Sequence, residues 1–168
     1  MPRSFHVEVE SSATVQDVLA AFGNKAYWQA RLATFGNGTA TLDALSVDAT
    51  DTVTVAITLN LLADRLPRVV TQLRRGDLEM VRTERWSADA PERVRGNLTA
   101  SIPGAPMSMT GEALITPADG GSRLDYAASV EVRIPLVGGR IESYIAGHAG
   151  KEIAAIQRFT TDWIAANY

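Results

Sequence analysis

The C-terminal stretch from Val137 to Tyr168 constrains the fold of this chain more than any other. It contains no proline, and small and apolar residues recur in it at steps of three and four, the period of one helical face. This face consists of Ile141, Ile145, Ala149, Ile153, Ile156, Thr160 and Trp163. At a rise of about 1.5 Å per residue, the helix would be roughly 40 Å long, longer than a small domain is wide. It therefore needs a large partner surface.

A second row of side chains widens this helical face. The row consists of Tyr144, His148, Glu152 and Phe159. Gly147 and Gly150 lie in the same stretch, and a glycine inside a helix costs about 1 kcal/mol relative to alanine. Two of them indicate either a close backbone approach or open space beside the helix.

Most of the preceding sequence alternates with a period of two, which is typical of half-buried strands. The first strand begins with the alternating residues 5–10. Thr14, followed by Asp17, predicts the start of a short helix, and a second short helix follows over 25–34. Further strands are predicted over residues 39–48, 52–62, 78–86, 93–102, 107–116 and 122–134.

Turn signals separate most of these strands. Pro103-Gly104 and Gly120-Gly121 are examples, and such tight connections imply antiparallel neighbours. The sequence therefore predicts an α+β fold. In it, a curved antiparallel sheet of about seven strands carries the long C-terminal helix, and two short helices follow the first strand.

A short basic helix is predicted over 65–75, beginning near Pro67. Its apolar face is surrounded by Arg65, Arg68, Arg74 and Arg75. Such an element could touch an anionic lipid surface, or it could be an ordinary surface helix with one solvated side. The acidic balance of the whole chain favours the ordinary surface helix.

Composition limits the possible functions. A length of 168 residues favours a single domain over 1–168, and the net charge of -3 argues against a nucleic-acid partner. No apolar run of about eighteen residues predicts membrane insertion. The absence of cysteine excludes thiolate metal sites, and together with the lack of a signal-like start it favours a cytoplasmic location. No motif indicates a nucleotide or another cofactor.

Three stretches resemble one known superfamily. They are Val132 to Glu142, Glu84-Arg85-Trp86 and Pro103-Gly104-Ala105-Pro106. Together with the order of elements, they resemble an uncharacterised bacterial branch of the START-like (SRPBCC) superfamily, which includes pollen-allergen, lipid-transfer and polyketide cyclase groups. The resemblance implies the helix-grip fold, in which a curved sheet wraps the long helix and leaves a cavity for an apolar ligand.

The strand over 78–86 carries charged and apolar residues on one face. Arg82, Glu84 and Trp86 share this face with Leu78 and Met80. If the face points inward, the Arg-Glu pair could orient the polar head of a ligand. If it points outward, the pair is a solvated patch of little energetic value. The apolar members favour the inward interpretation, whereas the arginines of the next strand, over 93–102, are expected on the outer face.

Ten residues are candidates for the cavity wall. Methionines suit a pocket of irregular shape, although core filling explains any single one as well. His148 could point into the cavity or sit hydrogen-bonded at the core edge, whereas His6 is expected in solvent. No spacing of His and carboxylates predicts a metal site. The candidates are Met80, Glu84, Trp86, Met107, Met109, Tyr126, Tyr144, His148, Ala149 and Ile153.

Three functions remain open at this point. The first is a binding or carrier protein that encloses a hydrophobic small molecule, such as a lipid or a polyketide-like compound. The second is a cyclase- or dehydratase-type enzyme in which His148, Tyr126 or Glu84 supplies a proton. The third is a packed domain that acts through a protein partner. The interior separates them: an open cavity with two convergent ionisable groups favours the enzyme, an open apolar cavity favours the carrier, and a cavity too small for a ligand favours the third. The sequence assigns no oligomeric state.

Overall fold

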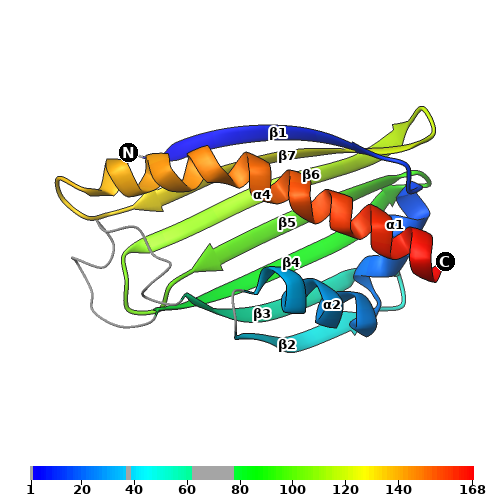
Figure 1. Cartoon of the computed structure of the whole chain (residues 1–168), viewed down its shortest axis with the longest axis horizontal. Helices are drawn as coiled ribbons and strands as arrows, with labels where there is room; N and C mark the ends of the chain where they lie inside the picture. Colours follow the sequence, from blue (N-terminus) through cyan, green and yellow to red (C-terminus); the bar gives the residue numbers. More distant parts are fainter. Residues whose placement is uncertain (1, 37–38, 62–77) are drawn as a thin grey trace.

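The structure is a computed structural model that describes residues 2–36, 39–61 and 78–168. Seven strands and three helices follow one another in these residues. The order is β1 (Arg3–Ser11), α1 (Val15–Phe22), α2 (Lys25–Phe35), β2 (Ala40–Val47), β3 (Val53–Leu61), β4 (Leu78–Ala90), β5 (Arg93–Ser101), β6 (Met107–Ala118), β7 (Gly121–Val132) and α4 (Gly138–Asn167). Figure 1 shows this α+β architecture, which confirms the predicted fold class.

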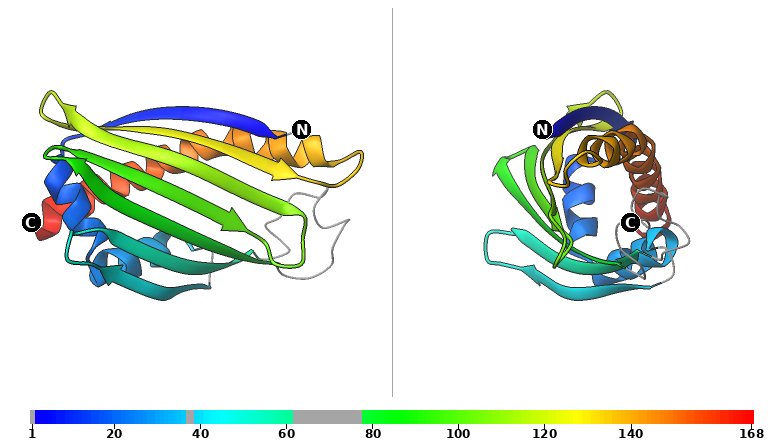
Figure 2. Two further views of the ribbon diagram at one scale, coloured as in Figure 1. Left: turned by 180° about the vertical axis from the view of Figure 1, so that it is seen from behind. Right: turned by 90° about the vertical axis from the view of Figure 1, so that its left-hand side faces the viewer.

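The seven strands form one antiparallel sheet in the order β1-β7-β6-β5-β4-β3-β2. Apart from β1 and β7, strands that are neighbours in the sheet are also consecutive among the described strands. Most of the sheet is therefore a meander. The first strand pairs with the last, with Val7 opposite Tyr126. The end-on view in Figure 2 shows the sheet curling around α4, which lies along its concave side.

Three of the predicted strand ends are wrong by two or more residues, and one of them is that of β6, which continues to Ala118 rather than ending at Thr116. β4 was predicted to end at Trp86 but continues to Ala90, because its last residues pair with Arg93 to Arg95 of β5 across a tight turn. A bulge between Ala88 and Ala90 shifts the register of this pairing by one residue. β7 ends at Val132, two residues before the predicted end, since the chain then turns into α4.

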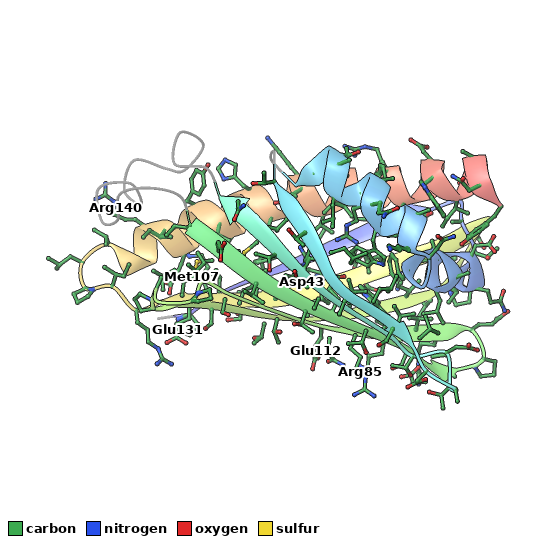
Figure 3. The ribbon with its side chains drawn as sticks, turned by 90° about the horizontal axis from the view of Figure 1, so that it is seen from below. Asp43, Arg85, Met107, Glu112, Glu131 and Arg140 are labelled. Carbon is green, nitrogen blue, oxygen red and sulfur yellow. The ribbon has the colours of Figure 1, made fainter. Side chains whose placement is uncertain are left out.

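The two faces of the sheet differ as the alternation predicted. β5 places Val94 and Leu98 in the core, whereas Arg93 and Arg95 are exposed. Figure 3 shows the charged outer side chains of the sheet, such as Arg85, pointing away from α4. The concave face is therefore the one that packs against the helices.

The helices α1 and α2 pack against the C-terminal half of α4 (Figure 1). Thr14 caps α1 by accepting a hydrogen bond from the Asp17 amide at 3.1 Å, as predicted. Tyr27 and Trp28 of α2 are completely buried, and the Tyr27 ring contacts Trp163 of α4 edge-on. This aromatic packing fixes one end of α4.

The other end of α4 is tied to the sheet by a buried carboxylate. Glu142 is 2% exposed, and its Oε2 accepts a hydrogen bond from the Val132 amide at 2.8 Å. Ile141 packs nearby against Val130 and Met107. The junction after β7 is therefore anchored by one polar contact and a small apolar cluster.

The predicted basic helix over 65–75, with its four arginines, lies outside the described residues. Among the helices that are described, none has the combination of length and apolar character needed to cross a membrane.

Replacing Glu142 with alanine should lower the free energy of unfolding by about 2 kcal/mol, because the buried Val132 amide then loses its acceptor. Urea unfolding followed by circular dichroism measures this change. The exposed neighbour provides the control: Ser143→Ala should change stability by less than about 0.5 kcal/mol. Equal losses in the two variants would contradict the anchoring role of Glu142.

Candidate functional site

A cavity of about 340 Å³ lies between α4 and the concave face of the sheet. Its walls are mainly apolar, and they come from α4 and from strands β1, β3, β4, β6 and β7. Among the sequence candidates, those that line it are Met80, Met107, Met109, Tyr126, Tyr144, His148, Ala149 and Ile153. The remaining two, Glu84 and Trp86, line a smaller inner chamber of about 40 Å³.

The cavity and the inner chamber adjoin each other. Arg82, Tyr126, Ile153 and Ile156 line both spaces. The two spaces therefore share a charged side chain, that of Arg82.

Ala149, a small residue of α4 between its two packed ends, lines the cavity. Gly147 is exposed and does not line the cavity, and a Cβ added there would meet no atom within 4 Å. Gly150 lies closer to the sheet, since a Cβ there would be 3.7 Å from Val7. The two glycines thus correspond to the two situations considered from the sequence, with open space at Gly147 and a nearby strand at Gly150.

His148 and Tyr144 lie at the solvent-exposed rim of the cavity. Both residues are exposed, and their rings are 4.2 Å apart between centroids. Nδ1 of His148 donates to the Tyr144 carbonyl oxygen at 2.7 Å, because a carbonyl only accepts. This contact fixes the imidazole within its own helix turn and leaves it in contact with water.

Glu84 is the centre of a buried charge cluster in the inner chamber. It is 1% exposed, and its Oε1 accepts a hydrogen bond from Trp86 Nε1 at 3.0 Å. Its Oε2 lies 3.0 Å from Nε of Arg82 and 3.6 Å from Nη2 of Arg31. The Arg82 contact is ionic, because Nε and Oε2 do not meet in hydrogen-bond geometry.

These neighbours determine the ionisation of Glu84. Burial alone would raise the pKa of this carboxyl, but Arg82, Arg31 and the hydrogen bond from Trp86 outweigh burial and lower the pKa below its usual value. Burial likewise would lower the pKa of Arg31, yet Tyr27 and Glu84 outweigh it and raise that pKa. Both groups are therefore charged at neutral pH.

Two glycines make room for the aromatic rings beside Glu84. A Cβ at Gly96 would lie 2.5 Å from the Trp86 ring, and one at Gly111 would lie 2.8 Å from the Tyr126 hydroxyl. Each ring thus covers a glycine on a neighbouring strand. Burial raises the pKa of the Tyr126 phenol, which consequently remains neutral.

Sequence reasoning missed Arg31 and Gln157, which also line the inner chamber. Arg31 stacks over Trp28, with its guanidinium carbon 4.6 Å from the ring centroid, and its Nη1 donates to the Tyr27 hydroxyl at 3.4 Å. The spacing of Tyr27, Trp28 and Arg31 on one helix face was the available signal. Gln157 offered none, since it lies beside the apolar stripe rather than within it.

The structure also brings His6, Glu8 and Asp125 together on the outer face of the sheet. Their possible ligand atoms all lie within 4.8 Å of one another. His6 is exposed, as predicted, and this grouping follows from the pairing of β1 with β7, which residue spacing could not show. Exposed groups of this kind are common without a bound ion, so the cluster indicates no function.

Gly96→Ala should lower the free energy of unfolding by about 2 kcal/mol, because the added methyl group forces the Trp86 ring out of its place. Gly147→Ala is the control with the opposite sign. It adds a methyl group in open space within a helix, so stability should rise by up to about 1 kcal/mol. Urea unfolding of both variants measures these changes. An unchanged free energy of unfolding in Gly96→Ala would contradict the close packing of Gly96 against Trp86.

Glu84→Gln should destabilise the protein by about 3 kcal/mol near neutral pH, because the buried Arg31 and the partly buried Arg82 lose their counter-ion. The folded-state pKa of Glu84 is lowered, so its stabilisation is present above the unfolded value and is lost as the pH falls through the folded one. The difference in the free energy of unfolding between wild type and variant should therefore become smaller below about pH 4.

Urea unfolding between pH 7 and pH 3 measures this difference. The exposed Glu92→Gln provides the matched control and should differ little from wild type throughout. A difference for Glu84→Gln that does not change with pH would contradict the ionised state of Glu84.

The chain is similar over nearly its full length to a mycobacterial protein. Uncharacterized protein Rv0481c of Mycobacterium tuberculosis (strain H37Rv) is 37% identical over 173 residues, which cover 99% of each chain. The family model described as "Protein of unknown function (DUF2505)" matches residues 6–164.

Solved structures share the fold at low sequence identity. TTHA0849 from Thermus thermophilus has a TM-score of 0.60 at 14% identity, covering 99% of this chain and 100% of its own. Norcoclaurine synthase from Thalictrum flavum, in complex with dopamine and hydroxybenzaldehyde, has a TM-score of 0.53 at 10% identity. The match covers 100% of this chain and 89% of the synthase chain. These likenesses show the sheet-and-helix fold alone.

Proposed function

We propose that this chain, which belongs to the DUF2505 family of proteins of unknown function, is a binding or carrier protein that encloses a hydrophobic small molecule between its sheet and α4. The observation that carries the proposal is the cavity of about 340 Å³ with mainly apolar walls. Ligand sites commonly have volumes of about 300–1,000 Å³ and such walls. Membership of the START-like superfamily, which the sequence motifs imply, is part of the proposal.

The size and lining of the cavity favour a single compact ligand. Its volume lies near the lower end of the usual range, which suits one acyl chain or a small ring system better than a lipid with two chains. Met80, Met107 and Met109 supply flexible walls that can adapt to such a shape. On the helix side, the small side chain of Ala149 leaves room for the ligand.

The ionisable groups favour binding over catalysis. A general acid or base is most effective when its pKa lies near the operating pH. The pKa of Glu84 is lowered by its two arginines, and the pKa of Tyr126 is raised by burial, so neither is tuned for proton transfer. His148 is exposed at the rim. The synthase noted above holds two small aromatic molecules, which supports a ligand inside this fold rather than a shared reaction.

The third possibility, a packed domain that acts only through a partner, accounts for less of the structure. Filling the cavity with larger side chains would stabilise such a domain, since empty apolar space forfeits dispersion contacts. The small residues of α4 are more readily explained by a ligand that occupies the space.

Native mass spectrometry of the protein purified from cells tests the proposal. We expect an added mass that leaves on denaturation and that solvent extraction identifies as a hydrophobic small molecule. A bare protein mass, both after purification and after incubation with fatty acids and polycyclic compounds, would argue against a carrier.

Ala149→Trp should reduce the affinity for the neutral apolar dye Nile red at least tenfold, because the indole fills the cavity. Ala165→Trp is the matched control, since Ala165 is exposed on the same helix and does not line the cavity. Fluorescence titration measures both affinities. Equal affinities in the two variants would place the dye, and with it the proposed site, elsewhere.

A further inference from the structure

The inner chamber differs chemically from the cavity beside it. Arg31, Arg82, Glu84 and Gln157 meet there around a space of about 40 Å³, at one point of an otherwise apolar interior. A space of this size holds one or a few water molecules or a small polar group. Arg82 lines the chamber and the cavity alike, so a ligand in the cavity can reach it.

In the part of the chamber that the structure describes, one hydrogen-bond donor lacks an acceptor. Gln157 is 4% exposed, and among the described residues its Nε2 has no hydrogen-bond partner. Nε of Arg82 and Oε2 of Glu84 are different, because they lie 3.0 Å apart and satisfy each other as an ion pair although their alignment is poor for a hydrogen bond. Buried polar groups are normally satisfied, so an unpartnered amide nitrogen on a side chain that lines a small chamber indicates that an acceptor can bind there.

The charge of the cluster points to an anion. Among the described residues that line the chamber, two arginines face one carboxylate, which leaves one positive charge in excess. Arg31 is already held by Trp28, Tyr27 and Glu84. Arg82 is therefore the better placed of the two to meet a ligand. Glu152 lines the outer cavity rather than the chamber, and of the groups that raise the pKa of Arg31 its charge contributes least, because its carboxylate is exposed to water.

We propose that the ligand is a monocarboxylic acid whose carboxylate enters the inner chamber between Arg82 and Gln157 while its apolar part fills the cavity. This inference rests on the proposed function. A carboxylate brings acceptor oxygens only, and its planar shape matches the guanidinium fork. Its single charge equals the excess of the cluster, whereas a phosphate monoester carries about 1.5 to 2 negative charges.

Isothermal titration calorimetry with matched probes tests the inference. The probes are dodecanoate and dodecanol, and 2-naphthoate and 2-naphthol, so each pair differs only in the head group. For at least one pair, we expect the carboxylate to bind about tenfold or more tightly than its alcohol, because it gains charge-assisted hydrogen bonds.

Gln157→Leu separates recognition from structure. The substitution removes an unpartnered buried amide at similar volume, so the fold should be as stable as wild type or more stable. Affinity for the carboxylate should nevertheless fall about tenfold, with the alcohol unaffected. Gln29→Leu, on the exposed side of α2, is the control and should change neither affinity.

Arg82→Gln should abolish the preference for the carboxylate, but this variant also leaves Glu84 with one arginine fewer and can lose stability. The test therefore does not depend on it, because Gln157→Leu leaves the ion pairs intact.

The outcomes separate the two proposals. Equal binding of acid and alcohol, or a Gln157→Leu variant with unchanged preference, would overturn the carboxylate assignment and leave the carrier function standing. Failure of both probe pairs and of Nile red to bind would overturn the carrier function and this inference with it.

Discussion

The structure depends on the packing of one long helix against a curved sheet. A helix of 30 residues cannot bury its apolar stripe alone, and the concave face supplies the partner surface. Two clusters fix the helix, an aromatic one around Tyr27 near its C-terminus and a smaller one around Ile141 near its start. Between them, small residues such as Ala149 leave the interior unfilled. The cavity thus arises because α4 is packed tightly at its two ends and carries small side chains between them.

The buried charge cluster makes one end of this interior polar. Two arginines and a glutamate are costly to desolvate, and apolar residues of similar size would often stabilise a core equally well. Here Glu84 is surrounded by Trp86, Arg82 and Arg31, so its charge is balanced, whereas Gln157 is left without an acceptor in the described part of the chain. A polar end on an apolar cavity suits an amphipathic ligand, which supports both proposals from one set of contacts.

Local patterns predicted nearly all of the described elements, because alternation and helical period are properties of neighbouring residues. Strand ends were less predictable. β4 extends to Ala90 only because β5 returns beside it, and β7 stops at Val132 because α4 begins. Most cavity candidates came from the faces of predicted strands and of α4. The inward direction of Glu84 and Trp86 was favoured by their apolar neighbours on β4, and their burial agrees with it.

The sequence by itself determined which segments are helices and strands and which face of each is apolar, since these follow from side-chain periodicity. Only the tertiary structure decided that Arg31 of α2, Glu84 of β4 and Gln157 of α4 meet in one chamber. These residues come from three elements far apart in the chain, and no local spacing encodes their approach. Curvature of the sheet and the position of α4 bring them together, because packing of the whole core fixes both.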